Sequence, residues 1–237
     1  MSVAAIVVAG GVGKRLKSRV RKSFVRLAGR PMLAWALKAL ERSPLVQDVV
    51  VVAHARDLPA ARALVRRERS RKVSAVVQGG DSRSASVRCG IAALPVRSKW
   101  VLVHDAARPL VTPGLIEATV KAARRTKAAI AAVPVVPTIK QGKAGWVVRT
   151  LDRSVLWAVQ TPQVFERKLL EEAHRRAMAS ARGSLTRRFS AHGFAATDDA
   201  ALIEAMGKKV RIVPSSDRNL KVTTPEDLKI AQALLRK

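Results

Sequence analysis

A chain of 237 residues, 48% of them hydrophobic, is long enough for one large α/β domain and too apolar for wholesale disorder. Its 45 Lys and Arg residues against 17 Asp and Glu residues give a formal net charge of +28, which favours anionic substrates or polyanionic partners. No apolar run reaches the roughly 20 residues that cross a bilayer, and the single cysteine, Cys89, excludes an intrachain disulfide and a cysteine-based metal cage.

The first 133 residues alternate between short valine-rich runs and helical patterns. Short runs that are apolar on both faces predict buried parallel strands, here at residues 4–8, 49–53, 73–77, 100–103 and 128–133. Apolar residues at helical spacing predict helices at residues 31–41, 58–69, 84–94 and 112–125. This order indicates right-handed βαβ units, in which ligands bind at the carboxyl ends of the strands.

The pattern changes after residue 133. Two extended runs around a turn at 141–145 predict a β-hairpin, so we expect an arm at about 134–153 that projects from the sheet and serves a partner subunit. A basic helix at 166–181, a short strand at 207–213 and a capped final helix to Arg236 follow. We therefore expect one domain over 1–237, with a Rossmann-like, mostly parallel sheet, helices on both faces and a protruding β-hairpin arm.

The first candidate site is the glycine-rich loop directly after the first strand. Gly10, Gly11 and Gly13 let backbone N–H groups approach phosphate oxygens closely. Arg15 and Lys22 add cations that suit a triphosphate. The loop lacks the Gly-Lys-Ser/Thr of the Walker sequence, and no acidic residue ends the second strand as a dinucleotide fingerprint requires. Taken alone, the loop is also compatible with a plain glycine turn.

Three further segments place polar residues at the ends of expected elements. Asp105 follows a buried strand, where a lone carboxylate suits Mg²⁺ that takes its other ligands from substrate phosphates. The alternative for Asp105 is a helix cap or a partner for Arg108. The glycines of 78–86 again follow a strand, although Asp81 or Ser84 could simply cap the next helix. Lys221 precedes the last helix and, by itself, is compatible with a solvated charge.

Four short motifs follow one another along the chain. They are His-Asp-Ala-Ala-Arg-Pro at 104–109, Thr-Pro-Gln at 161–163, Thr-Asp-Asp-Ala at 197–200 and Lys-Val-Thr-Thr-Pro-Glu-Asp-Leu at 221–228. With the glycine loop, they make nearly the whole chain resemble the 2-C-methyl-D-erythritol 4-phosphate cytidylyltransferases of the non-mevalonate isoprenoid pathway. The resemblance implies transfer of CMP from CTP to that sugar phosphate, which releases pyrophosphate and forms 4-diphosphocytidyl-2-C-methyl-D-erythritol.

The resemblance also implies roles for individual residues. The catalytic set, which stabilises charge on the reacting phosphates, comprises Arg15, Lys22 and Lys221. Asp105 binds Mg²⁺ and faces both substrates. The nucleotide-binding set comprises Ala9, Gly10, Gly11, Gly13, Gly80, Asp81 and Ser86. The sugar-phosphate site is lined by Arg108, Thr161 and Thr197, and across a homodimer by Thr138 and Arg153 of the partner's arm.

The chain departs from the family pattern near the catalytic loop. Gly10 stands where the family has the second alanine of Pro-Ala-Ala-Gly, and we expect it to loosen the loop. Arg21 and Ser23 stand where Pro-Lys-Gln surrounds the second catalytic lysine, so proline rigidity is lost there. Pro137 replaces a common aspartate in the arm, and Asp199 replaces a glutamate.

Two alternative functions remain at this stage. Ribitol 5-phosphate cytidylyltransferases share the fold, the nucleotide and much of the loop set, although Ala-Ala-Arg-Pro at 106–109 favours methylerythritol phosphate. The other alternative is a non-catalytic basic protein that binds RNA, but aromatic residues make up 3% of the chain and tyrosine is absent, which leaves little for base stacking. We expect non-specific nucleic-acid binding as a side effect of the charge, a cytoplasmic location because no signal-peptide pattern occurs, and no membrane association.

Overall fold

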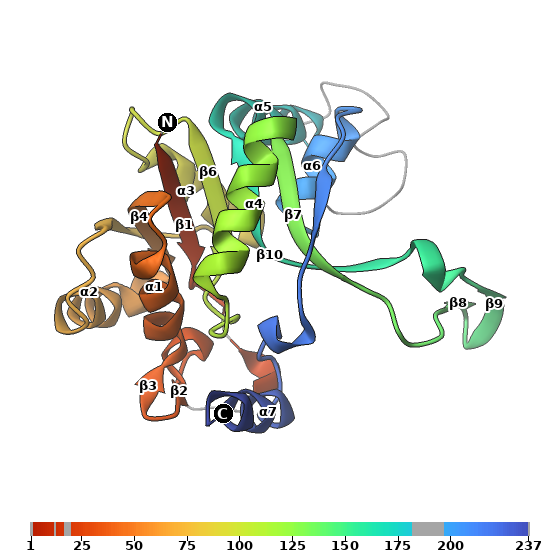
Figure 1. The fold of residues 1–237 in the computed structure, drawn as a ribbon, viewed down its shortest axis with the longest axis horizontal. Coiled ribbons are helices and arrows are strands. Elements are labelled where there is room, and N and C mark those ends of the chain that lie inside the picture. Colours follow the sequence, from red (N-terminus) through yellow and green to blue (C-terminus); the bar gives the residue numbers. More distant parts are fainter. Residues whose placement is uncertain (1, 12, 17–19, 182–196, 237) are drawn as a thin grey trace.

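A computed structural model describes residues 2–11, 13–16, 20–181 and 197–236 (Figure 1). Seven strands form one sheet in the order β11-β7-β10-β6-β1-β4-β5. These strands are β1 Val3–Val8, β4 Val46–Ala53, β5 Val73–Gln78, β6 Trp100–Asp105, β7 Ala128–Pro134, β10 Trp157–Glu166 and β11 Arg211–Pro214. Neighbouring strands are parallel, except that β10 runs antiparallel to both β6 and β7. The mostly parallel α/β fold expected from the sequence is confirmed.

Helices cover both faces of this sheet. They are α1 Met32–Arg42, α2 Leu58–Arg67, α3 Arg83–Ala92, α4 Pro113–Thr126, α5 Arg167–Ala181, α6 Asp199–Ala205 and α7 Pro225–Leu235. Val3, Ala5 and Val7 of β1 pack with α1, α2 and α4, whereas Ala4 and Ile6 pack with α3, α5 and α6. Side chains alternate between the faces of a strand, so the continuous apolar run of β1 is explained by burial on both sides.

The shorter elements lie mainly in the connections. They are β2 Arg26–Leu27, β3 Arg30–Pro31 and the 3₁₀ turns η1 Lys14–Leu16, η2 Lys22–Phe24, η3 Ala55–Asp57, η4 Arg153–Val155 and η5 Asp217–Asn219. A third apolar cluster joins Leu27 of β2 to Val222, which precedes α7, and to Ala231 on α7. α7 begins with a capping box between Thr224 and Asp227, which satisfies backbone N–H groups at its first turn.

A separate hairpin of β8 Lys140–Lys143 and β9 Trp146–Thr150 extends away from the body of the molecule (Figure 1). The sequence predicts this arm, and the structure confirms it. Every residue of both strands is exposed in the single chain. No helix of the described residues is long and apolar enough to cross a membrane.

Several elements differ from the sequence-based prediction. α6, β2 and β3 were not predicted, and β8 occupies part of the expected turn at 141–145. The last strand begins at Arg211 rather than 207, because Gly207 adopts a φ of +71° at the end of α6 and delays the return to the sheet. β10 was not predicted, because Gln160, Thr161 and Gln163 interrupt its apolar pattern. These three side chains are nevertheless buried, because each finds a hydrogen-bond partner inside the protein: Asn219 for Gln160, His104 for Thr161 and Asp198 for Gln163.

The order of the strands determines where a ligand can bind. From β1 the chain adds β4 and β5 on one side, and it then crosses back to place β6 on the other side of β1. The carboxyl ends of β1 and β6 therefore flank a topological switch point, where open α/β sheets bind ligands. Val8 pairs with Asp105 at this edge, so the glycine loop begins beside the carboxylate.

Candidate functional site

The glycine loop folds back against the segment that follows it. The N–H of Ala9 donates to the Val52 carbonyl at 2.7 Å, and the Ser23 hydroxyl donates to the Ala9 carbonyl at 2.9 Å. Gly13 has a φ of +72°, and a Cβ there would lie 2.8 Å from the Cβ of Lys22. This position therefore requires glycine. Val12 and residues 17–19 of the same segment lie outside the described residues.

Gly10 and Gly11 are less constrained. A Cβ on Gly10 would come no closer than 3.7 Å to the nearest atom, the backbone N of His54, and a Cβ on Gly11 would meet nothing within 4 Å. Both distances permit a larger residue. Glycine at these positions therefore leaves backbone open to a ligand but is not required by the fold.

Lys22 lies among other cations at the switch point. Burial, followed by the positive charges of Lys221 and Arg15, lowers its pKa to about 8, although Asp105 acts in the opposite direction. The three expected catalytic cations and the expected metal carboxylate are thus neighbours, although they come from both ends of the chain. Concentrated positive charge of this kind stabilises a polyanion.

Arg21 and Ser23 hold the segment around Lys22 in the absence of the family's proline. The Arg21 guanidinium Nε lies 3.0 Å from the Asp57 carboxylate, and its Nη2 lies 3.5 Å from Nε2 of His54. The ion pair is largely buried, with side-chain exposures of 21% and 13%. Together with the Ser23 hydroxyl, it ties Lys22 to β1 and to the connection after β4.

Asp105 is the buried anion at the centre of the site. Its Oδ2 accepts a hydrogen bond from Lys221 Nζ at 2.6 Å, and its Oδ1 accepts one from Arg83 Nε at 3.2 Å. Burial alone would raise the pKa of this carboxyl, but the two cations outweigh burial and hold the pKa well below its usual range. Asp105 is therefore ionised at neutral pH.

Arg83 extends this network away from the glycine loop. Its Nη1 donates to Asp199 at 2.7 Å, and Asp199 contacts Nε2 of His174 at 3.0 Å. The hydrogen bond with His174 and the charge of Arg83 lower the pKa of Asp199 despite its burial. Sequence reasoning missed Arg83 and His174. The only signal was one arginine at the start of a helix, three residues after Gly80.

His104 connects β6 to β10 from inside the protein. Burial lowers its pKa to about 4, so it is neutral at physiological pH. Its Nε2 lies 3.1 Å from the Arg108 carbonyl, which assigns the proton to Nε2, and its Nδ1 lies 2.9 Å from the Thr161 hydroxyl. The hydroxyl therefore donates to Nδ1, and its oxygen accepts from the N–H of Asp105 at 3.2 Å. Thr161 thus positions the backbone of Asp105.

Arg108 is almost fully buried and is held by backbone carbonyls. Its Nη1 donates to the carbonyl of Asn219 at 2.8 Å, and its Nη2 donates to that of Val159 at 3.2 Å. Its Nε finds no partner among the described residues. The Asn219 amide donates to Gln160 at 2.8 Å and to the Thr161 carbonyl at 2.9 Å. Asn219, which sequence reasoning also missed, therefore supports two of the expected sugar-phosphate residues.

The second glycine segment packs tightly against the start of α3. A Cβ on Gly80 would lie 2.6 Å from the Cβ of Ala85, and the Ser86 hydroxyl donates to the Gly80 carbonyl at 3.3 Å. The cap of α3 is Ser82, whose hydroxyl accepts from the N–H of Ala85 at 3.0 Å. The cap is thus neither Asp81 nor Ser84, so the exposed Asp81 is left for another role.

The structure does not bring every predicted residue to one place. Thr138 and Arg153 are exposed on the arm, which points away from the switch point (Figure 1). Arg153 donates to the Val136 carbonyl and so stabilises the base of the arm. Thr197 is exposed directly before α6, whose cap is Asp198. Within one chain, the arm residues cannot complete the site around Asp105.

A magnesium ion would find one protein ligand here. No group of three or more His, Cys, Asp or Glu side chains able to hold a metal occurs in the described part of the chain. Asp105 is an ionised oxygen donor, but both of its oxygens already face cations. This donor set fits Mg²⁺ where substrate phosphates supply the other ligands, since that ion is commonly bound by one or two carboxylates together with phosphates.

Comparison with known proteins agrees with this geometry. The family model described as 2-C-methyl-D-erythritol 4-phosphate cytidylyltransferase matches residues 3–237. The chain belongs to this family. The cytidylyltransferase of that name from Pelotomaculum thermopropionicum is 44% identical over 236 residues, which cover 99% of this chain and 94% of the relative. The one from Synechocystis sp. is 40% identical over 231 residues, with 97% and 95% covered.

Solved structures of the family show the same fold. The 4-diphosphocytidyl-2C-methyl-D-erythritol synthase of Anaerococcus prevotii superposes with a TM-score of 0.84 at 28% identity, over 100% of this chain and 96% of that one. The 2-C-methyl-D-erythritol 4-phosphate cytidylyltransferase of Thermus thermophilus gives 0.76 at 31% identity, with 98% of both chains covered. The family and the enzyme class predicted from the motifs are confirmed, and the matched family is that of methylerythritol phosphate.

Proposed function

We propose that this cytidylyltransferase transfers CMP from CTP to 2-C-methyl-D-erythritol 4-phosphate, releasing pyrophosphate and forming 4-diphosphocytidyl-2-C-methyl-D-erythritol. The observation that carries the proposal is the convergence of Arg15, Lys22 and Lys221 around Asp105 at the switch point. An oxygen of the sugar phosphate attacks the α-phosphorus of CTP, and the bond from that phosphorus to the bridging oxygen of the β-phosphate breaks.

The reaction needs positive charge and alignment rather than a general base. The attacking phosphate is already anionic near neutral pH, so no side chain has to remove a proton. Lys22 and Arg15 offset the charge that grows on the α-phosphate, and Lys221 contacts phosphate next to them. Electrostatic stabilisation and alignment of this kind are the main catalytic devices of phosphoryl-transfer enzymes.

Asp105 would hold Mg²⁺ together with the phosphates of CTP. The bound ion would supply further positive charge to the triphosphate. Because Asp105 is already ionised, no proton has to leave before it binds a cation. Lys221, now paired with Asp105 at 2.6 Å, would then be free to contact a substrate phosphate.

The two loops at the carboxyl ends of β1 and β5 suit the nucleotide. We assign backbone groups of Ala9, Gly10, Gly11, Gly13 and Gly80 to the phosphates, ribose and base, with Asp81 and Ser86 reading cytosine and ribose. Ser86 is buried and bonded to Gly80, whereas Asp81 is exposed. The carboxylate of Asp81 is thus free to hydrogen-bond the cytosine base, and Ser86 fixes the shape of the loop that contacts the nucleotide.

We propose that the sugar-phosphate site is completed by a second copy of the chain. Arg108 and Thr161 are positioned from within one chain, whereas Thr138 and Arg153 reach the site only from a partner. The arm also exposes Trp146 (80%), Val147 (66%) and Val148 (55%). Apolar side chains gathered on a projecting hairpin are typical of an interface, and a homodimer through the arm would cover them.

Two further properties follow from composition. The net charge of +28 supports weak, salt-sensitive binding to nucleic acid as a side effect, because counterion release drives such binding without sequence recognition. The single cysteine is compatible with the cytoplasm, where we place the enzyme.

The assay is pyrophosphate release in the presence of Mg²⁺ and CTP, with either 2-C-methyl-D-erythritol 4-phosphate or ribitol 5-phosphate as acceptor. We expect rapid release with the first acceptor and little with the second. Release with ribitol 5-phosphate alone would reassign the substrate. Release with neither acceptor would refute the enzyme activity.

A further inference from the structure

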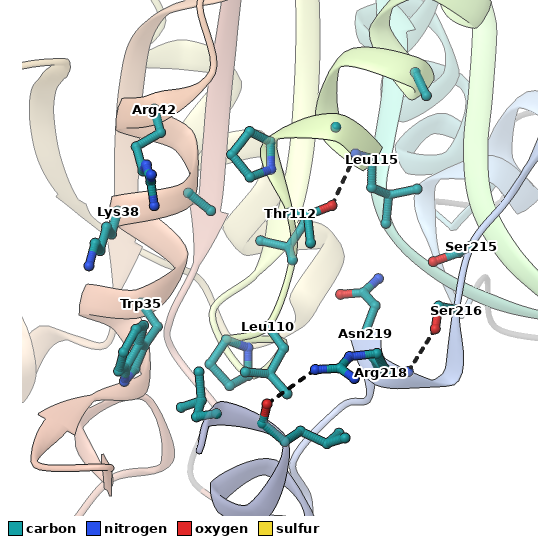
Figure 2. A pocket seen from close by; sticks show the side chains of 18 of the residues that line it. Trp35, Lys38, Arg42, Leu110, Thr112, Leu115, Ser215, Ser216, Arg218 and Asn219 are labelled. Carbon is teal, nitrogen blue, oxygen red and sulfur yellow. Dashed lines mark hydrogen bonds between the residues drawn. The ribbon is translucent and has the colours of Figure 1, made fainter. Parts of the chain in front are cut away.

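The segment that follows Arg108 lines a pocket of about 590 Å³ (Figure 2). The other walls come from α1, from η5 with the residues before it, and from the end of α7. Its volume lies within the range of about 300–1,000 Å³ that is typical of small-molecule sites. None of the residues assigned above to CTP, the metal or the sugar phosphate lines this pocket, so the pocket is separate from the groups that hold the substrates.

The lining combines an apolar surface with cations. Apolar side chains predominate, among them Trp35, Ala39, Leu110, Val111, Leu115 and Leu234. Figure 2 shows Lys38 and Arg42 on α1 at one side and Arg218 on η5 at the other. No Asp or Glu occurs among the described lining residues. The first turn of α4 also faces the pocket, and the positive end of a helix dipole adds to the attraction for an anion.

The wall of this pocket is connected to the sugar-phosphate site. Asn219 lines the pocket, and its carbonyl accepts the hydrogen bond from Arg108 at 2.8 Å. Arg218, the preceding residue, donates to the Leu234 carbonyl at 3.2 Å and so links η5 to α7 across the pocket (Figure 2). A molecule that packs against η5 therefore contacts the residue that holds Arg108 in place.

We propose that this pocket binds an amphipathic organic phosphate, and that its occupation alters the affinity for the sugar phosphate through Asn219 and Arg108. The apolar chain packs against Trp35 and Leu110, and the phosphate lies near Lys38 and Arg42. A phosphate dianion suits this place because one guanidinium can donate two parallel hydrogen bonds to phosphate oxygens. No carboxylate in the lining repels the negative charge.

Charge favours this occupant over the arm of a second copy. The arm offers apolar side chains, but it also carries Lys140, Lys143 and Arg149. Docking it here would bring these cations towards Lys38 and Arg42, and like charges brought together in an interface disfavour that pairing.

The test is calorimetric titration of the free enzyme with decyl phosphate below its micelle concentration, with decanol and inorganic phosphate as partial ligands. We expect decyl phosphate to bind at least tenfold more tightly than either. The Lys38→Gln/Arg42→Gln variant should bind it about tenfold more weakly. The matched control, Arg62→Gln/Arg66→Gln on the exposed face of α2, loses the same charge and should bind within twofold of wild type. Equal binding of decanol, or equal affinity of the two double variants, would overturn the site.

A second variant separates this pocket from the active site. Ala118 is exposed on α4 and lines the pocket, so Ala118→Phe fills space without disturbing the core. It should abolish decyl phosphate binding and leave kcat unchanged. Saturating decyl phosphate should change the KM for the sugar phosphate at least threefold in wild type and not in Ala118→Phe. An unchanged KM in wild type would refute the coupling between the pocket and the sugar-phosphate site. Dissociation of a dimer by decyl phosphate would show that the arm of a second copy occupies the pocket. The titrations contain no substrate, so their outcome is independent of the proposed activity.

Discussion

Replacing Arg21 tests how this chain positions Lys22 without the family's proline. Arg21→Ala removes the ion pair of 3.0 Å with Asp57 and the contact with His54. Exposed ion pairs contribute about 0–1 kcal/mol, and removing one partner of a buried pair costs more because it leaves a charge unpaired, so we assign about 1 kcal/mol to the loss of Arg21 from this largely buried pair. If that energy positions Lys22, its loss lowers kcat about fivefold, because about 1.4 kcal/mol corresponds to a factor of ten.

The assay is steady-state pyrophosphate release at varied CTP, together with thermal unfolding. We expect kcat to fall and the KM for CTP to stay within twofold. Arg21 has a φ of −59° and a ψ of 143°, which a proline adopts without strain. Arg21→Pro should therefore retain most of the activity that Arg21→Ala loses. Arg62→Ala on α2 serves as the matched control and should leave kcat unchanged.

A double-mutant cycle decides whether Arg21 acts through Lys22. In a Lys22→Ala background, Arg21→Ala should cause no further loss of kcat, because there is no lysine left to position. Additive losses in the double variant would refute this reasoning, as would wild-type kcat in Arg21→Ala alone.

Three other predictions follow from the loop and the arm. Because the pKa of Lys22 is lowered to about 8, its charge is present below that pH and lost above it, so kcat/KM should fall above pH 8. In Lys22→Arg the fall should move to higher pH. A fall at the same pH in this variant would show that Lys22 is not the titrating group. In urea denaturation, Gly13→Ala should cost about 1–2 kcal/mol because of its φ of +72°, whereas Gly10→Ala should be neutral or stabilise by up to about 1 kcal/mol; equal effects would contradict the packing described. Trp146→Ser should weaken the proposed homodimer at least tenfold in light-scattering dilution series, and an unchanged dimer would place the interface elsewhere.

The sequence predicted the parts of the site that depend on local pattern. Glycines directly after a buried strand and an aspartate at the end of another are visible in one dimension, and parallel strands bring their ends to one edge. The arm was also predictable, because two extended runs around a turn form a local pattern. By contrast, β10 carries buried polar residues such as Thr161, and only the fold reveals the partners that allow its burial, His104 and the N–H of Asp105.

The supporting network was not predictable from spacing. Arg83 contacts Asp199 across 116 positions of sequence, and Lys221 is equally far from Asp105. Neither partner can be chosen from a list of charged residues without the fold. The departures at Arg21 and Ser23 predicted a looser lysine, whereas the structure shows both side chains holding the segment, through Asp57 and the Ala9 carbonyl.

The most direct test of the central claim compares turnover with nucleotide binding in Lys22→Ala. If Lys22 stabilises charge that develops on the α-phosphate, kcat should fall about 100-fold or more, as it does when a single transition-state donor is removed. The Kd for CTP should rise less than about threefold, measured by titration calorimetry with Mg²⁺. A weakened CTP affinity with an unchanged kcat would contradict the claim, because it would show that Lys22 binds the nucleotide equally before and during the reaction.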